Sequence, residues 1–247
     1  MRVALILLTV ALSSGCMTVP STKGFQASGP YMKMEVGYSQ SLDAKFREDT
    51  PNSPDCFLFV TGTTCGGSLD HLGNAWLFGV GAGYRFPGGI RADVTYNKRT
   101  GYNLKGWDPA GTYYDPDVKT DTVMVNGTFD LPVVMGKFKP FIGAGIGRSR
   151  NEMKPLNWFD PGFGSGTLNG GTKSDTAWQL TLGADIALHQ QWTLEVLYRY
   201  TDLGSFVKNF GPDQATPSGC FSASCNTVSA TGKLRSNEFI IGIRRSF

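Results

Sequence analysis

Apolar and polar residues alternate along eight stretches of the chain. Residues 192–204, "WTLEVLYRYTDLG", place Trp, Leu, Val, Tyr and Tyr on one side of an extended strand and Thr, Glu, Leu and Arg on the other. A period of two residues predicts β-strands with one apolar and one polar face. The other seven stretches are residues 31–39, 75–86, 90–97, 123–131, 139–147, 177–188 and 237–247.

The links between these stretches are alternately short and long. Three are short turns, at residues 87–89, 132–137 and 189–191, whereas the others run to roughly 20–35 residues rich in Gly, Asp, Asn, Ser and Pro. Structureless loops of that length are uncommon in a compact soluble domain. Short periplasmic turns and long extracellular loops are typical of outer-membrane barrels. We therefore predict an all-β fold, an eight-stranded antiparallel transmembrane β-barrel.

In such a barrel the apolar faces contact lipid and the charged faces point inward. Several apolar faces carry aromatic residues near their ends, as in the interfacial girdles of membrane barrels. An eight-stranded interior is just wide enough for side chains to fill, so we expect a network of paired charges there. A narrow ion pathway and a soluble, lipocalin-like barrel with reversed faces are the alternatives. The predicted interior set is Lys33, Glu35, Arg85, Arg91, Asp93, Asp130, Asp185, Glu195, Arg199, Glu238 and Arg244.

The first residues have the pattern of an export signal. A short basic start, the apolar run "VALILLTVAL" and the small residues "SSG" precede Cys16. This predicts a signal peptide at 1–15, a flexible lead-in at 16–30 and a barrel domain at 31–247. The position of Cys16 loosely matches a lipoprotein signal, which makes it a candidate for acylation. No other stretch approaches the ~20 apolar residues that a spanning helix requires.

The remaining cysteines form two close pairs, Cys56 with Cys65 and Cys220 with Cys225. An even number of cysteines in an exported chain favours disulfides, and local pairing is the simplest of three connectivities. A metal site is the weaker interpretation, because neither pair has CxxC spacing and no histidine lies near enough in sequence. We expect no bound metal and no cofactor.

Charge and histidine content argue against two other functions. The net charge of +3 does not indicate a nucleic-acid partner. The two histidines, His71 in a long loop and His189 in a short turn, lack a nucleophile motif such as GxSxG. We therefore expect a protein that is not an enzyme.

Three motifs resemble one known family. "LEVLYRYTDLG", "KPFIGAGIG" and a final strand that ends in Phe247 are similar to the opacity-protein and OmpA-like eight-stranded outer-membrane β-barrel superfamily of Gram-negative bacteria. The resemblance covers about residues 31–247. It implies an outer-membrane location, contact with membrane lipids and lipopolysaccharide, and folding by the barrel-assembly machinery. The residues that match the assembly signal are Phe239, Ile241, Ile243 and Phe247, whereas Arg245 departs from the usual apolar residue.

The loops carry the strongest functional hypothesis. They combine Trp, Tyr and Phe with Gly, Asp and Pro, a composition suited to adaptable recognition surfaces. We expect a structural, surface-exposed protein that supports envelope integrity, with adhesion to host or surface ligands or antigenic display through the loops. The alternative function is a narrow, porin-like pore for ions or small solutes.

Overall fold

The computed structural model describes fourteen segments of the chain. They are residues 28–42, 44–48, 60–61, 64–65, 68–69, 73–103, 106–107, 113–114, 117–133, 135–160, 164–168, 170–189, 191–210 and 228–247. Within these segments no helix is both long enough and apolar enough to cross a membrane.

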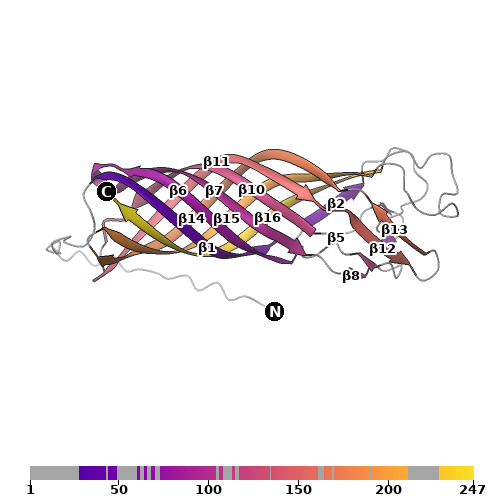
Figure 1. Cartoon of the computed structure of the whole chain (residues 1–247), viewed down its shortest axis with the longest axis horizontal. Coiled ribbons are helices and arrows are strands. Elements are labelled where there is room, and N and C mark those ends of the chain that lie inside the picture. Colours follow the sequence, from indigo (N-terminus) through magenta and orange to yellow (C-terminus); the bar gives the residue numbers. More distant parts are fainter. Residues whose placement is uncertain are drawn as a thin grey trace.

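Eight long antiparallel strands form a closed barrel (Figure 1). Each pairs with its neighbours along the chain, and the first pairs with the last from Tyr31 with Ser246 to Ser41 with Ser236. This closure leaves no free edge along the body of the barrel, the condition for a sheet to sit in lipid. The strands are β1 (Gly29–Ser41), β6 (Asn74–Arg85), β7 (Ile90–Asn103), β10 (Asp117–Asp130), β11 (Phe138–Met153), β14 (Gly171–His189), β15 (Trp192–Phe210) and β16 (Val228–Ser246).

The strand number and fold class predicted from the sequence are confirmed, but the strands are longer than expected. The alternating stretches run for 8 to 13 residues, whereas β14, β15 and β16 each have 19. The extra residues lie toward the long links, where the hairpins continue beyond the apolar surface. Polar residues there still form backbone hydrogen bonds between strands. The strands therefore extend beyond the stretches in which apolar and polar residues alternate.

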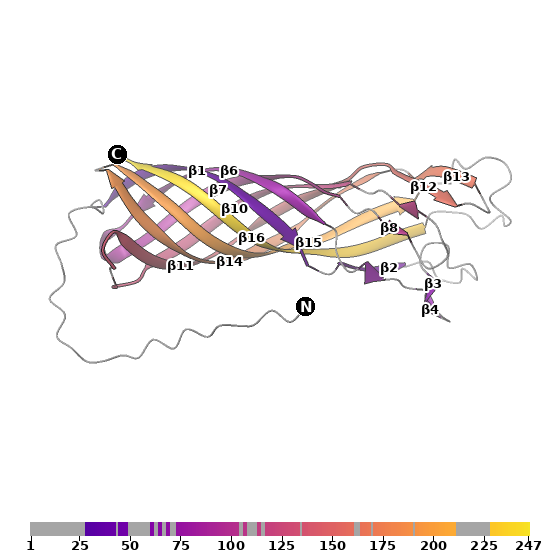
Figure 2. The same cartoon turned by 90° about the horizontal axis from the view of Figure 1, so that it is seen from below.

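Short strands also occur in the links expected to be structureless. β2 (Ala44–Glu48) pairs with the upper part of β16, and β5 (Ser68–Leu69) pairs with β2. β3 (Val60–Thr61) pairs with β4 (Thr64–Cys65). A second sheet has the order β13-β12-β9-β8 and lies beyond the barrel at the long-link end (Figures 1 and 2). Its strands are β8 (Gly106–Trp107), β9 (Tyr113–Tyr114), β12 (Leu156–Asp160) and β13 (Gly164–Leu168).

The opposite end of the barrel is closed by short turns. The link after β6 is a single 3-10 turn, η1 (Pro87–Gly89), in which Gly88 and Gly89 both have positive φ. The chain ends here too, with Phe247 beside the start of β1 (Figure 1).

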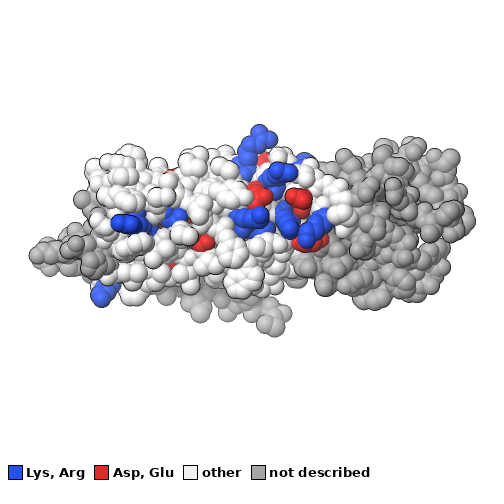
Figure 3. Space-filling view, viewed as in Figure 1, with Lys and Arg blue, Asp and Glu red and all other residues white. Residues whose placement is uncertain are grey.

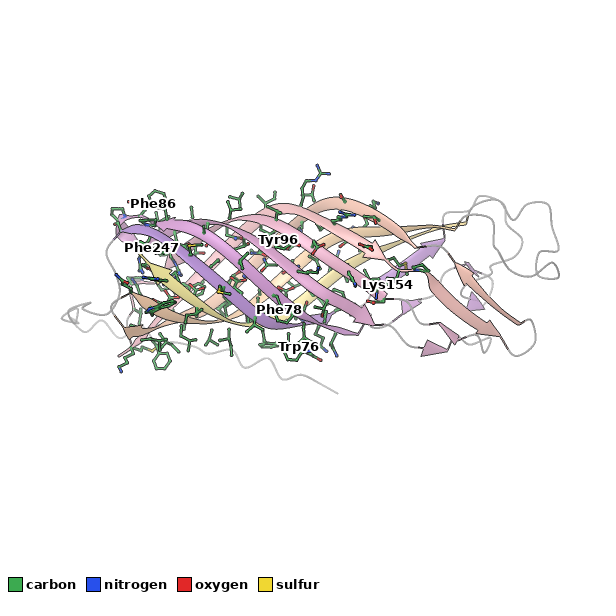
Figure 4. The ribbon with its side chains drawn as sticks, in the orientation of Figure 1. Trp76, Phe78, Phe86, Tyr96, Lys154 and Phe247 are labelled. Carbon is green, nitrogen blue, oxygen red and sulfur yellow. The ribbon has the colours of Figure 1, made fainter. Side chains whose placement is uncertain are left out.

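The outer surface of the barrel body is apolar, as the sequence predicts. Met34, Val80, Val125 and Ile146 are all more than half exposed in the isolated chain. Aromatic residues lie toward both ends of this belt (Figure 4): Phe86 and Phe247 at the turn end, Trp76 and Phe78 toward the long links. Amphipathic rings at both edges are typical of a bilayer-spanning barrel.

Arg245, which departs from the usual C-terminal pattern, lies among the aromatic residues at the turn end of the barrel. Its guanidinium carbon is 5.5 Å from the centre of the Trp192 ring and 5.2 Å from that of Phe247. Cation–π contacts of this kind stabilise an arginine near the interface, where its cost on a barrel surface is ~0–1 kcal/mol. An arginine is therefore compatible with this position.

Candidate functional site

The interior of the barrel is the most highly charged part of the described structure. The eleven charged residues that the sequence places inside are all buried, and Arg99 joins them with no exposed surface. The buried basic residues are Lys33, Arg85, Arg91, Arg99, Arg199 and Arg244, and the buried acidic residues are Glu35, Asp93, Asp130, Asp185, Glu195 and Glu238. Equal numbers of opposite charges allow each to be compensated without water, as buried charges require.

One cluster lies toward the turn end and centres on Arg91. Its guanidinium group is 2.9 Å from Asp130, 3.0 Å from Glu195 and 3.4 Å from Asp185. Arg244, on β16, contacts two of these acids. Its guanidinium group lies 2.6 Å from Asp185 and closer still to Glu195. Arg85 and Lys139 also contact Asp130. Strands from opposite sides of the barrel are thus joined through shared carboxylates.

A second cluster lies nearer the long links and centres on Glu238. Its Oε1 accepts a hydrogen bond from Arg99 Nε at 2.7 Å, and from the hydroxyls of Ser39 and Ser236 at 3.1 Å each. Arg199 reaches Glu238 at 3.8 Å and donates to both oxygens of Glu35 at 3.1 and 3.2 Å.

Lys33 and Asp93 extend the second cluster toward the turn end. The Lys33 ammonium lies 3.2 Å from Glu35 and 3.1 Å from Asp93. Asp93 also accepts hydrogen bonds from Tyr31 and Asn126, each at 2.7 Å. Tyr31 brings the two clusters together, because its hydroxyl binds Asp93 while its ring lies 5.4 Å from the guanidinium carbon of Arg244.

Little free volume remains inside this network. A cavity of about 20 Å³ lies among Lys33, Arg91, Asn126 and Gln179. One water molecule needs ~10–15 Å³ of accessible volume, so the cavity can hold about one water molecule. The Phe141 ring fills the wall beside it, and Gly183 makes room for that ring, because a Cβ there would lie 2.6 Å from it.

Toward the long links the interior becomes apolar. Six buried residues from six strands form one cluster there, which we call the mouth cluster: Ala75, Tyr102, Val118, Met153, Leu203 and Leu234. Tyr102, Val118, Leu203 and Leu234 have no exposed surface.

β15 bends over the mouth cluster at Gly204. Pairing between β14 and β15 ends at Trp178 with Asp202, and the pairing of β15 with β16 shifts register between Asp202 and Ser205. Gly204 lies at the bend with φ +73°, a left-handed conformation that strongly favours glycine.

Side chains of β11 and β14 hold this bend in place. The Ser149 hydroxyl and the Asn151 amide donate to the Leu203 carbonyl at 2.6 and 3.0 Å. Asp175 accepts hydrogen bonds from the backbone N–H and the hydroxyl of Ser205 at 2.8 and 2.5 Å. We call Ser149, Asn151, Asp175 and Ser205 the β15 latch. It replaces the strand pairing that is lost above Asp202 and keeps Leu203 inside the mouth cluster.

Other predicted residues lie outside the described side chains. Cys16, Cys56, Cys220, Cys225 and His71 lie outside the described residues, as do residues 1–27 of the predicted signal and lead-in. Only the backbone is described for Cys65, in β4, and for His189, at the end of β14. Disulfide pairing, lipidation and the export signal therefore stay predictions. The four residues of the predicted assembly signal all face outward on or just after β16: Phe239, Ile241, Ile243 and Phe247.

Reasoning from the sequence missed three features of this region. Arg99 lies beyond the alternating stretch, which ends at residue 97, although the inward positions 91, 93, 95 and 97 lead directly to it. The mouth cluster was missed because inward apolar residues do not stand out against an outward apolar face. The β15 latch joins residues far apart in sequence, and no local pattern indicates it.

Comparison with known proteins supports the architecture and identifies the family. The sequence is 28% identical over 185 residues to the outer membrane protein PagN of Salmonella typhimurium, covering 68% of this chain and 72% of PagN. It is 32% identical over 131 residues to RC1281, a candidate adhesin of Rickettsia conorii, covering about half of each chain (51% and 52%). The structure resembles that of OprG from Pseudomonas aeruginosa, with a TM-score of 0.52, 15% identity and coverage of 89% of this chain and 96% of OprG.

A match to a protein family covers almost the entire chain. The outer membrane protein beta-barrel domain matches residues 8–247, from before the first strand to the final Phe247. The predicted resemblance and the outer-membrane location are therefore confirmed, and the long links lie at the cell surface. The chain belongs to the outer membrane protein beta-barrel domain family of Gram-negative outer membranes.

Proposed function

We propose that the protein is a non-enzymatic surface adhesin, whose barrel anchors and orients four long extracellular links that bind a host or surface ligand. The barrel itself contributes to the integrity of the outer membrane. The observation that carries this proposal is the filled interior: twelve buried charges and the mouth cluster occupy the space that a channel or a catalytic cavity would need.

The outer end of the barrel has the form expected of a rigid support. β14, β15 and β16 continue well above the apolar belt, and the β15 latch ties β15 to β11 and β14 there. The second sheet, β8-β9-β12-β13, joins two of the long links to each other above the barrel. A support of this kind restricts the links and so lowers the entropy lost on binding.

The relatives point in the same direction. RC1281 is described as a candidate adhesin, and PagN as an outer membrane protein. Neither description names an enzyme, which agrees with the proposal for this chain.

Loop exchange tests the adhesive role. Four variants would each replace one long link, at residues 43–72, 104–116, 155–170 or 211–227, with a short Gly-Ser linker. Bacteria that display the intact protein should adhere to cultured epithelial cells, and at least one variant should fall to the level of cells without the protein. Each variant must still show a heat-dependent shift in gel mobility, which reports a folded barrel. Undiminished adhesion by all four variants would contradict the proposal.

The pore alternative has a separate test. Intact protein in planar bilayers should leave the conductance at the level of protein-free membranes, because apolar residues close the mouth of the barrel. Regular conductance steps that scale with the amount of folded protein would instead favour a pore. Neither outcome depends on which loop binds.

Three further proposals concern assembly and the cysteines. We propose that Phe247 and the outward residues of β16 form the signal for the barrel-assembly machinery, so deletion of Phe247 should lower the amount of folded protein in the outer membrane.

We also propose the disulfides Cys56–Cys65 and Cys220–Cys225, which alkylation with and without reduction would detect. Acylation of Cys16 would appear as incorporation of labelled fatty acid, lost in Cys16→Ser.

A further inference from the structure

Two arginines on the outer face of β11 have no partner among the residues that the structure describes. Arg148 and Arg150 are exposed and follow Ile146, the last apolar outward residue of that strand. Neither guanidinium group forms an ion pair or hydrogen bond with any residue that the structure describes. In contrast, the exposed Arg235 binds Asp202 at 3.1 Å, and Lys154 binds Asp117 at 2.5 Å.

The neighbouring strand places hydroxyl groups opposite both arginines. In the register of β11 with β14, Arg148 pairs with Thr176 and Arg150 with Ser174, and both hydroxyl residues are exposed on the outer face. Directly opposite residues on one face of an antiparallel pair have Cβ atoms about 4.5–5.5 Å apart. Two guanidinium groups and two hydroxyls therefore form one strip of hydrogen-bond donors, which we call the arginine strip.

Two carboxylates lie beside the arginine strip, Asp121 on β10 and Glu152, the next outward residue of β11. Two lysines on the same face offset them, because Lys119 lies opposite Glu152 and Lys98 opposite Asp121. On β10, Asp121 lies opposite Arg150 and Val123 opposite Arg148. Asp121 accepts a hydrogen bond from the Tyr96 hydroxyl at 2.9 Å and also lies opposite Lys98 on β7. Figure 3 shows that Lys and Arg gather between the apolar surface and the outer end, interrupted by a few Asp and Glu.

The position of the arginine strip relative to the bilayer indicates which ligand it can reach. Its two rows begin directly above the row of Ile146 and Trp178. Two residues of a strand advance about 6.7 Å, and with a tilt of about 40° the rows lie about 5 and 10 Å above the apolar belt. The headgroup layer of a bilayer begins at that edge and adds about 5–8 Å on each side. Arginine side chains at such a boundary extend their charge into the headgroups.

We propose that the arginine strip binds a phosphate group of the phosphorylated glycolipid in the outer leaflet, lipopolysaccharide. Arg148 and Arg150 supply planar, permanently charged donors that match phosphate oxygens, and Thr176 and Ser174 add neutral donors from the adjacent strand. The site lies on the wall of the barrel in the membrane plane, apart from the loops of the proposed adhesive function. It fixes the height and the lipid surroundings of the barrel.

A binding assay with defined lipids tests this proposal. Folded protein in detergent micelles is titrated with fluorescent lipid A that carries two phosphates and with lipid A that carries none. The double variant Arg148→Gln/Arg150→Gln should bind the diphosphorylated lipid about ten- to thirtyfold more weakly, since each arginine near such a surface adds ~1 kcal/mol. Arg235→Gln, an exposed arginine already paired with Asp202, is the matched control and should retain the affinity of the intact protein.

Each outcome decides for or against the proposal. Loss of affinity confined to the double variant and to the phosphorylated lipid would support it, and added salt should reduce the difference. Equal affinity of the double variant and the intact protein would overturn it, as would equal binding of both lipids. The same titration with heparin gives a third outcome. If the double variant loses more affinity for heparin than for diphosphorylated lipid A, the proposal is overturned, because the strip would then recognise a soluble sulfated polysaccharide. Heat-dependent gel mobility confirms that every variant is folded.

Discussion

The middle of the barrel and its mouth are filled by opposite kinds of chemistry. In the middle, opposite charges fill the interior in pairs, such as Arg91 with Glu195 and Arg99 with Glu238. At the mouth, apolar residues such as Leu203 and Leu234 pack together, and polar groups of the β15 latch bind backbone atoms instead. The difference teaches that one barrel wall can enclose either a charged or an apolar core. The energetic consequences of a substitution should therefore differ between the two regions.

Breaking the charged core should have the largest effect. In Glu238→Leu, Arg99 and Arg199 both lose a buried carboxylate. Loss of one partner of a buried ion pair costs about 3–5 kcal/mol, so the free energy of unfolding should fall by about that amount in a urea titration in lipid vesicles.

A second substitution separates lost pairing from lost packing. Adding Arg99→Met to Glu238→Leu removes one uncompensated charge and should restore part of the stability. Glu152→Leu, which changes an exposed carboxylate on β11, should leave the free energy of unfolding nearly unchanged. Equal losses in Glu152→Leu and Glu238→Leu would show that burial of the pair is not the cause.

The apolar core of the mouth should respond to volume rather than to charge. Leu234 has no exposed surface, and Leu234→Ala leaves a cavity among the mouth cluster. We expect a loss of about 2–3 kcal/mol, in the lower part of the range for buried leucines, because the end of a barrel relaxes more easily than its middle. Leu234→Met keeps the volume and should cost less than about 1.5 kcal/mol in the same titration.

The bend that separates the two regions depends on one glycine. In Gly204→Ala the new Cβ would lie 2.6 Å from the Asp175 Cβ, on a backbone with φ +73°. We expect a loss of about 1–2 kcal/mol from the left-handed conformation and a weaker β15 latch. Gly127→Ala is the matched control, since a Cβ there meets nothing within 4 Å. Faster amide exchange near Ser205 in the Gly204 variant, but not in the control, would locate the effect.

The charged core could largely be predicted from the sequence, because a period of two residues decides which face each side chain occupies. Glu35, Arg91 and Arg199 were assigned to the interior in this way. Their partners could not be predicted, since contacts such as Arg199 with Glu35 depend on how the strands are staggered when β1 closes on β16. The alternation therefore predicts burial but not the network.

The mouth was much harder to predict. Leu203 and Leu234 continue the inward pattern of their strands, but nothing local indicates that they meet in one apolar cluster toward the long links. The bend at Gly204 requires Ser149 and Asp175 from two other strands, so it follows from tertiary contacts alone. Arg148 and Arg150 lie just beyond the alternating stretch that ends at residue 147, and only the strand register shows which hydroxyl groups lie opposite them.

The smallest expected effect comes from an exposed ion pair at the outer edge, which tests whether burial is the reason that breaking the charged middle costs so much. Lys154, labelled in Figure 4, follows β11 and binds Asp117 at 2.5 Å while remaining exposed to solvent. The hydrogen bond to Asp117 and the charge of that carboxylate raise the pKa of Lys154 above its ordinary value of 10.5. The pair therefore adds its stability fully below pH 10.5 and loses it as the pH rises through the higher pKa of the folded state. Because water and salt screen an exposed pair, Lys154→Met should barely change the urea midpoint at pH 7, and the intact protein should approach the variant above pH 11. A loss at pH 7 as large as that of Glu238→Leu would mean that the contrast between the charged middle and the exposed edge does not depend on burial.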